Sequence, residues 1–168
     1  MIVRFHPDSD REALVAATAE YAALWEEWGA RIVAALEDAA GLSFAERFIN
    51  AIVFEGISGS HPLAFRASYD REAKLSAIAH ELAHRLLAGN RRRLGLGPYQ
   101  PGRDREEHEL IDLFLYDAWC DLWGEEFAQR QVAVESGYRS FYREAWEATL
   151  ALDRAGRVAR LAGVRQGV

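Results

Sequence analysis

The sequence contains very little cysteine and no long hydrophobic segment. Cys120 is the one cysteine among 168 residues, so no intrachain disulfide bond can form. No apolar run reaches the roughly 18 residues that are needed to span a bilayer. Residues 1–7 lack the apolar segment that a signal peptide requires. We therefore expect a protein of a reducing, cytoplasmic compartment.

Positive charge is also scarce. The chain has 20 Lys and Arg against 26 Asp and Glu, which gives a net charge of −6 at pH 7. Nucleic-acid binding requires a basic surface, so we expect no nucleic-acid partner, and nothing predicts a membrane partner. Half of the residues are hydrophobic, which is typical of a globular chain. The length fits a single domain over residues 1–168.

The hydrophobic pattern predicts a mostly helical α+β fold. Apolar residues recur at helical spacing over residues 10–40, with Asp8 or Ser9 as the candidate N-cap and Gly41 after the last turn. Residues 48–55 and 63–69 are strand candidates, separated by a loop rich in glycine and serine. We expect these two strands to form a small sheet or hairpin.

The second half of the chain is predicted to contain three helices. The first covers residues 70–88, with Asp70 as its N-cap. A turn-rich segment over residues 95–102 leads to a helix over residues 104–133, which we expect to be broken near Gly124. The last helix covers residues 138–161. The expected order is thus one long helix, two strands and three helices.

The helix over residues 70–88 carries the motif His80-Glu81-Leu82-Ala83-His84. Residues four apart on a helix lie one turn above each other, so both imidazoles can reach one metal ion. Neutral imidazoles suit zinc, and Glu81 on the neighbouring flank can take the proton of a water whose pKa the metal lowers. This pattern predicts a zinc site with Glu81 as the general base. The alternative is a pair of surface histidines on an ordinary amphipathic helix.

The rest of this helix favours the metal site. Its apolar stripe, which should face the core, is formed by Leu75, Ile78, Leu82 and Leu86. The histidine side carries the small residues Ala73, Ala77 and Ala88, which leave room for a metal, a water molecule and a substrate.

A catalytic zinc usually has three protein ligands and an open position. Of the remaining histidines, His108 is the preferred third ligand because it opens the helix that follows the turn-rich segment, whereas His6 and His61 lie in less suitable contexts. Glu109 lies at the edge of the same helix face and is the main rival.

Asp112 lies one turn after His108 on the inward side of its helix. Ligating histidines usually donate their free N–H group to a carboxylate, so we expect Asp112 to orient one imidazole. The alternative is a salt bridge between Asp112 and an arginine at the edge of the core. Asp117 and Asp121 fall on the opposite side and are predicted to be solvated.

The chain resembles the zincin metallopeptidases through His80-Glu81-Leu82-Ala83-His84, and its element order is similar to that of the minimal gluzincins. This resemblance implies a bound Zn²⁺, a peptide or protein substrate, and residues 63–69 as the edge strand that pairs with extended substrate. A gluzincin would use a glutamate such as Glu109 as third ligand, while His108 is as well placed. The metzincin extension is absent, because Arg85, Leu86 and Leu87 follow the motif.

The expected function is therefore that of a zinc metallopeptidase or related amide hydrolase, with Tyr116 or Tyr138 as possible donors to a developing oxyanion. One alternative is a catalytically inactive zincin-fold regulator, or a peptidase kept latent by the tail over residues 154–168. Another is a structural metal site that four protein ligands close. The sequence predicts neither a cleavage preference nor an oligomeric state.

Overall fold

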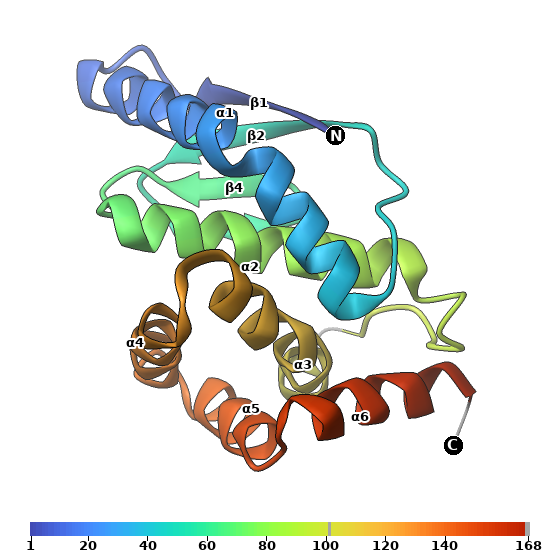
Figure 1. The fold of residues 1–168 in the computed structure, drawn as a ribbon. Coiled ribbons are helices and arrows are strands. Elements are labelled where there is room, and N and C mark those ends of the chain that lie inside the picture. Colours follow the sequence, from blue (N-terminus) through green and yellow to red (C-terminus); the bar gives the residue numbers. More distant parts are fainter. Residues whose placement is uncertain (101, 167–168) are drawn as a thin grey trace.

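The computed structural model describes residues 1–100 and 102–166, and it is mostly helical with one small mixed sheet (Figure 1). In chain order the elements are β1 (Ile2–Pro7), α1 (Glu12–Ala40), β2 (Phe48–Phe54), β3 (Gly59–Ser60), β4 (Leu63–Arg66), α2 (Arg71–Asn90), α3 (Asp104–Trp123), α4 (Glu125–Ser136), α5 (Ser140–Leu150) and α6 (Arg154–Gln166). The predicted α+β class is confirmed at this level. No helix in the described part of the chain is long and apolar enough to cross a membrane.

The sheet has the strand order β1-β2-β4-β3. Strands β1, β2 and β4 are parallel, and the short β3 is antiparallel to β4 at the edge. The small sheet was predicted, but the hairpin of its two predicted strands is wrong. The segment between β2 and β4 carries the chain back along the sheet, so that these strands run parallel, and the actual hairpin joins β3 to β4. The sequence pattern also did not predict β1.

Helices α1 and α2 cover one face of the sheet, onto which Ile49, Ala51 and Val53 point. Helix α1 begins at Glu12 after Arg11, which makes no side-chain cap, so the predicted caps are wrong. Gly41 ends α1 as predicted, since it adopts φ 56° in the left-handed region that glycine tolerates best.

Helix α2 forms as its sequence predicts. The side chain of Asp70 accepts a hydrogen bond from the backbone N–H of Ala73 at 2.8 Å, which confirms the N-cap. The predicted apolar stripe is buried in the core. The helix continues two residues past its predicted end, to Asn90, whose Nδ2 donates to the carbonyl oxygens of Leu86 and Ser43 at 2.9 Å each.

Helix α3 lies between α1 and α2 on one side and α4, α5 and α6 on the other (Figure 1). The break near Gly124 is confirmed, since this residue has φ 89° and separates α3 from α4. The helix predicted over residues 138–161 is two helices, because the Asp153 side chain accepts from the N–H of Gly156 at 2.7 Å and starts a new one.

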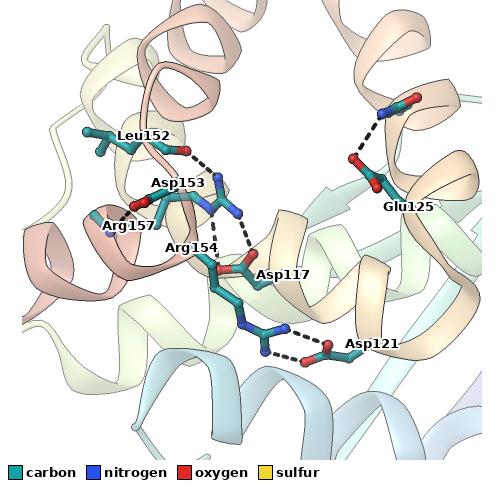
Figure 2. Close-up of polar contacts among 9 residues, drawn as sticks. Asp117, Asp121, Glu125, Leu152, Asp153, Arg154 and Arg157 are labelled. Atoms are coloured by element: carbon teal, nitrogen blue, oxygen red, sulfur yellow. Dashed lines mark hydrogen bonds and ion pairs between the residues drawn. The ribbon is translucent and has the colours of Figure 1, made fainter.

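The prediction that Asp117 is solvated is wrong. Asp117 is 4% exposed, and its Oδ1 accepts from Nη2 of Arg157 on α6 at 2.6 Å (Figure 2). Asp121 remains exposed and pairs with Arg154. The sequence of α3 by itself predicts one buried face. The packing of α6 against α3 buries a second face, on which Asp117 lies. Pro101 of the predicted turn and residues 167–168 of the predicted tail lie outside the described residues.

Candidate metal centre

Three histidine side chains from two helices meet beside the sheet. His80 and His84 lie on α2, and His108 lies in the second turn of α3. One nitrogen of each ring lies within 4.8 Å of the corresponding nitrogens of the other two. The ring centroids are 4.9–5.4 Å apart. This arrangement could hold a metal ion through three imidazole nitrogens.

His80 is oriented by a carboxylate that sequence reasoning missed. Its Nδ1 lies 2.7 Å from Oε1 of Glu135 on α4, and Oε2 of Glu135 accepts from Nε1 of Trp146 at 3.0 Å. With Nδ1 engaged in this way, Nε2 of His80 is the nitrogen left for a metal. Burial lowers the pKa of His80, but the charge and hydrogen bond of Glu135 outweigh it and raise that pKa to about 9.

A weak signal for Glu135 exists in the sequence. Gln131 and Glu135 occur at helical spacing after Phe127 and Ala128, so all four belong to the inward face of α4, and all four are buried. Polar residues at such positions need partners inside the protein. The sequence does not say which partner, because His80 is 55 residues away.

The ring of His108 is oriented by a backbone carbonyl group one helical turn earlier. Its Nδ1 lies 2.6 Å from the carbonyl oxygen of Asp104, so Nδ1 is the donor and Nε2 is unprotonated. This Nε2 is buried and has no hydrogen-bond partner among the described residues. A buried acceptor without a partner is costly, and coordination of a cation would satisfy it.

Two of the three imidazoles are kept neutral, as metal ligation requires. Burial, followed by the charge of His80, lowers the pKa of His108 to about 4. Burial, followed by the neighbouring charge of His80, lowers the pKa of His84 well below its usual value. The donor set therefore fits a metal that prefers nitrogen ligands.

Glu81 lies beside the three histidines and is 8% exposed. Burial raises the pKa of Glu81 to about 7, while the charge of His80 opposes this rise. A carboxylate with a pKa near neutrality can take up and release a proton at physiological pH.

The structure brings His108 to the site and turns Glu109 away. Glu109 is half-buried, and its Oε1 accepts from Nε of Arg105 at 2.7 Å. His61 is exposed on the rim of a neighbouring cavity, with Nδ1 3.0 Å from Oγ of Ser60. His6 lies on β1, where its Nε2 is 3.1 Å from Oδ1 of Asn50.

Asp112 is fully buried one turn after His108. Neither of its carboxylate oxygens has a hydrogen-bond partner in the described part of the chain, and the contact expected of Asp112 with an imidazole is made by Glu135 instead. Burial, followed by the charge of Glu135, raises the pKa of Asp112 well above its usual value.

The histidines and Glu81 line a cavity of about 480 Å³, here called the central cavity. A side pocket of about 90 Å³ adjoins His80 and Glu81, and its walls include Ala73, Ala77 and Tyr138. A second cavity of about 560 Å³ adjoins His84 and His108 and includes Ala88. The predicted small residues therefore line open space.

Of the two tyrosines that were expected as oxyanion donors, Tyr138 lies at the site and Tyr116 does not. Tyr138 lines the central cavity, whereas Tyr116 packs against Trp146 and is not among the residues lining any cavity beside the histidines. Tyr142, which sequence reasoning missed, also lines the central cavity and packs edge-on against His108 with centroids 4.4 Å apart. Its position one helical turn after Tyr138 was the available signal.

The edge strand beside the site is β3 and not the predicted segment over residues 63–69. Strand β4 lies between β2 and β3, so its edges are both occupied where they pair. Gly59 and Ser60 of β3 line both the central cavity and the second cavity. Strand β3 has only two residues, and glycine and serine are not typical of strands, so the sequence pattern did not predict it.

Comparison with protein-family models, curated proteins and solved structures gives no match to this chain. The geometry of the site therefore carries the functional argument.

Proposed function

We propose that this chain is a zinc-dependent peptidase or a closely related amide hydrolase of the zincin type. The observation that carries the proposal is the convergence of His80, His84 and His108 next to Glu81 on one open cavity. Three protein ligands with access to a cavity are typical of catalytic zinc sites, whereas structural sites have four ligands and are closed. No fourth histidine, cysteine or carboxylate joins the three histidines within the described residues.

Zinc is the metal that the donor set favours, because three imidazoles without a thiolate or a ligating carboxylate suit it well. When bound, zinc would supply a Lewis acid that lowers the pKa of water to about 7 and polarises a carbonyl group. Glu135 holds His80 in the orientation that presents its Nε2 to the cavity, and the Asp104 carbonyl does the same for His108.

Glu81 is the proposed general base and then general acid. Its carboxylate would take one proton from the water that attacks the scissile carbonyl carbon. As the carbon–nitrogen bond breaks, Glu81 would return this proton to the leaving amine, which yields an amine and a carboxylic acid that then releases its own proton to solvent. Its pKa of about 7 suits both directions of transfer.

Tyr142 is the proposed donor to the developing oxyanion. It lines the central cavity, and its hydroxyl group makes no hydrogen bond to another described residue. Burial and the nearby carboxylates raise the pKa of Tyr142, so the hydroxyl group keeps its proton. Tyr138 lies at the same cavity and is the second candidate.

The position of the C-terminal helix favours an accessible site over a latent one. Helix α6 packs on α1 and α3, and none of its described side chains lines the central cavity, the side pocket or the second cavity. Two arginines of α6 pair with Asp117 and Asp121 instead (Figure 2).

Metal analysis and one isosteric variant test the proposal. We expect one zinc per chain in the wild type and in Glu109→Ala, and loss of zinc in His108→Ala. Glu81→Gln should retain zinc and lose at least about 100-fold in hydrolysis of a library of internally quenched peptides. Full activity of Glu81→Gln, or a wild type that binds no zinc, would contradict the proposal. Zinc binding without hydrolysis of any peptide would favour the inactive regulator.

A further inference from the structure

Two arginines without acidic partners line the central cavity. Arg66 ends β4, and Arg139 directly precedes α5. Both side chains are exposed, and neither forms an ion pair with a described residue. The one side-chain hydrogen bond of Arg66 runs from its Nε to Oγ of Ser68 at 3.1 Å. Both guanidinium groups are therefore available to a ligand.

This pair differs from the other basic groups around the motif helix. Arg71 and Lys74 of α2 each pair with a glutamate of α1, and Arg85 of α2 pairs with Glu46 in the segment between α1 and β2. In a chain with net charge −6, carboxylates are in excess over basic groups. Two unpaired arginines on the same cavity as a candidate metal centre thus indicate a function in ligand binding.

The opposite side of the metal centre has another character. The second cavity is lined by Asp104, which also borders the central cavity, and by Glu107, and both carboxylates are already engaged. Asp104 accepts from the hydroxyl group of Tyr99 at 2.7 Å, and Glu107 accepts from Nη1 of Arg91 at 2.5 Å. The unpaired positive charge beside the histidines therefore lies at Arg66 and Arg139, on the central cavity.

The wall next to the two arginines is aromatic. Tyr69, Tyr138 and Tyr142 line both the central cavity and the side pocket. Cζ of Arg66 lies 5.9 Å from the ring centroid of Tyr69, which supports the guanidinium group on an aromatic face. Positive charges beside apolar rings are less hydrated than in bulk water and bind anions more strongly.

We propose that Arg66 and Arg139 form an anion subsite beside the metal centre and that the substrate carries a carboxylate there. This inference rests on the proposed hydrolase function and adds its substrate class. A guanidinium group binds a carboxylate through two parallel hydrogen bonds. The carboxylate belongs either to an aspartate or glutamate side chain or to the C-terminus of a short peptide.

Three peptide hydroxamates test this subsite, because a hydroxamate group binds zinc whatever the charge of the attached peptide. One carries glutamate and a C-terminal amide, the second carries glutamine and an amide, and the third carries glutamine and a free C-terminus. Calorimetry on the zinc-loaded protein should show at least one acidic probe binding on the order of 10-fold tighter than the neutral probe. The acidic probe that gains affinity identifies the source of the carboxylate.

Substitutions connect the preference to the two arginines. Arg66→Gln and Arg139→Gln should each reduce the preference for the acidic probe and leave the affinity of the neutral probe unchanged. Arg143→Gln is the matched control, because Arg143 is exposed on α5 and lines none of the three cavities. The preference should also weaken as the salt concentration rises.

The possible results separate the inference from the function on which it rests. Equal affinity for all three probes, or an acidic preference that survives both substitutions, would overturn the anion subsite. Absence of binding by every probe would contradict both proposals, since an open zinc site binds any of these hydroxamates. An acidic preference without hydrolysis of any acidic peptide would support the subsite and contradict the hydrolase.

Discussion

Helix α3 carries two buried polar clusters that differ in one respect. Near its start, His108 and Asp112 are the titratable side chains of the described chain that hold buried polar atoms without a hydrogen-bond partner. Near its end, Asp117 makes two hydrogen bonds with Arg157, which also donates to the carbonyl oxygen of Leu152 (Figure 2). Both clusters border a cavity, His108 the central cavity and Asp117 a smaller one of about 180 Å³, so they differ only in whether their buried polar atoms have partners.

This difference separates a site from a structural contact. Buried polar groups in folded proteins nearly always have partners, so an unpartnered group calls for a specific explanation. The Asp117–Arg157 pair is complete within the chain, and its function is to attach α6 to α3. The histidine cluster lacks such a partner within the described residues, and the metal ion that we propose would complete it. Burial and charge alone would not have distinguished the two clusters.

The largest expected effect is on the complete cluster. Asp117→Asn should lower the free energy of unfolding by about 3–5 kcal/mol, because it leaves the guanidinium group of Arg157 buried without its charge partner. Asp121→Asn, at the exposed pair with Arg154, should cost about 0–1 kcal/mol. Urea unfolding of the metal-free variants measures both. If Asp117→Asn changed zinc affinity and left stability unchanged, the distinction between a structural cluster and a metal site would be wrong.

A smaller effect is expected at the carboxylate that orients His80. Glu135→Gln should weaken zinc binding by about 10–100-fold, since outer partners of metal-binding histidines typically contribute that much. Glu126→Gln on the same helix is the control, because Glu126 is exposed and makes no side-chain hydrogen bond. Competition with a fluorescent zinc chelator gives both affinities. If Glu135→Gln bound zinc with wild-type affinity, Glu135 would have no function in orienting the metal ligand.

The smallest effect concerns the unpartnered carboxylate of Asp112. Its pKa is raised above the usual 3.8, so the metal-free folded state keeps a proton that the unfolded chain releases. The free energy of unfolding therefore falls as the pH rises above about 4. Between about pH 4 and pH 7 this fall should be steeper in the wild type than in Asp112→Asn, as urea unfolding at each pH would measure. Identical pH profiles of the two proteins would show that Asp112 has a partner.

Much of the helical part of the fold could be predicted from the sequence. The N-cap of α2, the end of α1 at Gly41 and the break at Gly124 depend on interactions within a few residues. The sheet was predicted less well, because strand pairing joins distant segments. The register of β1 against β2 and the edge position of β3 depend on contacts that no local pattern contains.

The candidate site divides in the same way. The spacing of His80, Glu81 and His84 on one helix placed two imidazoles and a carboxylate together before any tertiary structure was known. The structure brings His108 to them and leaves Glu109 to Arg105, a choice that depends on how α3 is rotated against α2. The orienting carboxylate of Glu135 lies on a different helix from the one predicted to supply it.

The sequence by itself determined that this chain has a helix with two histidines and a glutamate at metal-binding spacing, because helical geometry repeats every 3.6 residues and needs no distant contact. Only the tertiary structure decided which third imidazole meets them, that Asp117 is buried by α6, and that Arg66 and Arg139 line the same cavity. The physical reason is that each of these contacts joins different elements. Their positions follow from the packing of the whole core, which local propensity does not specify.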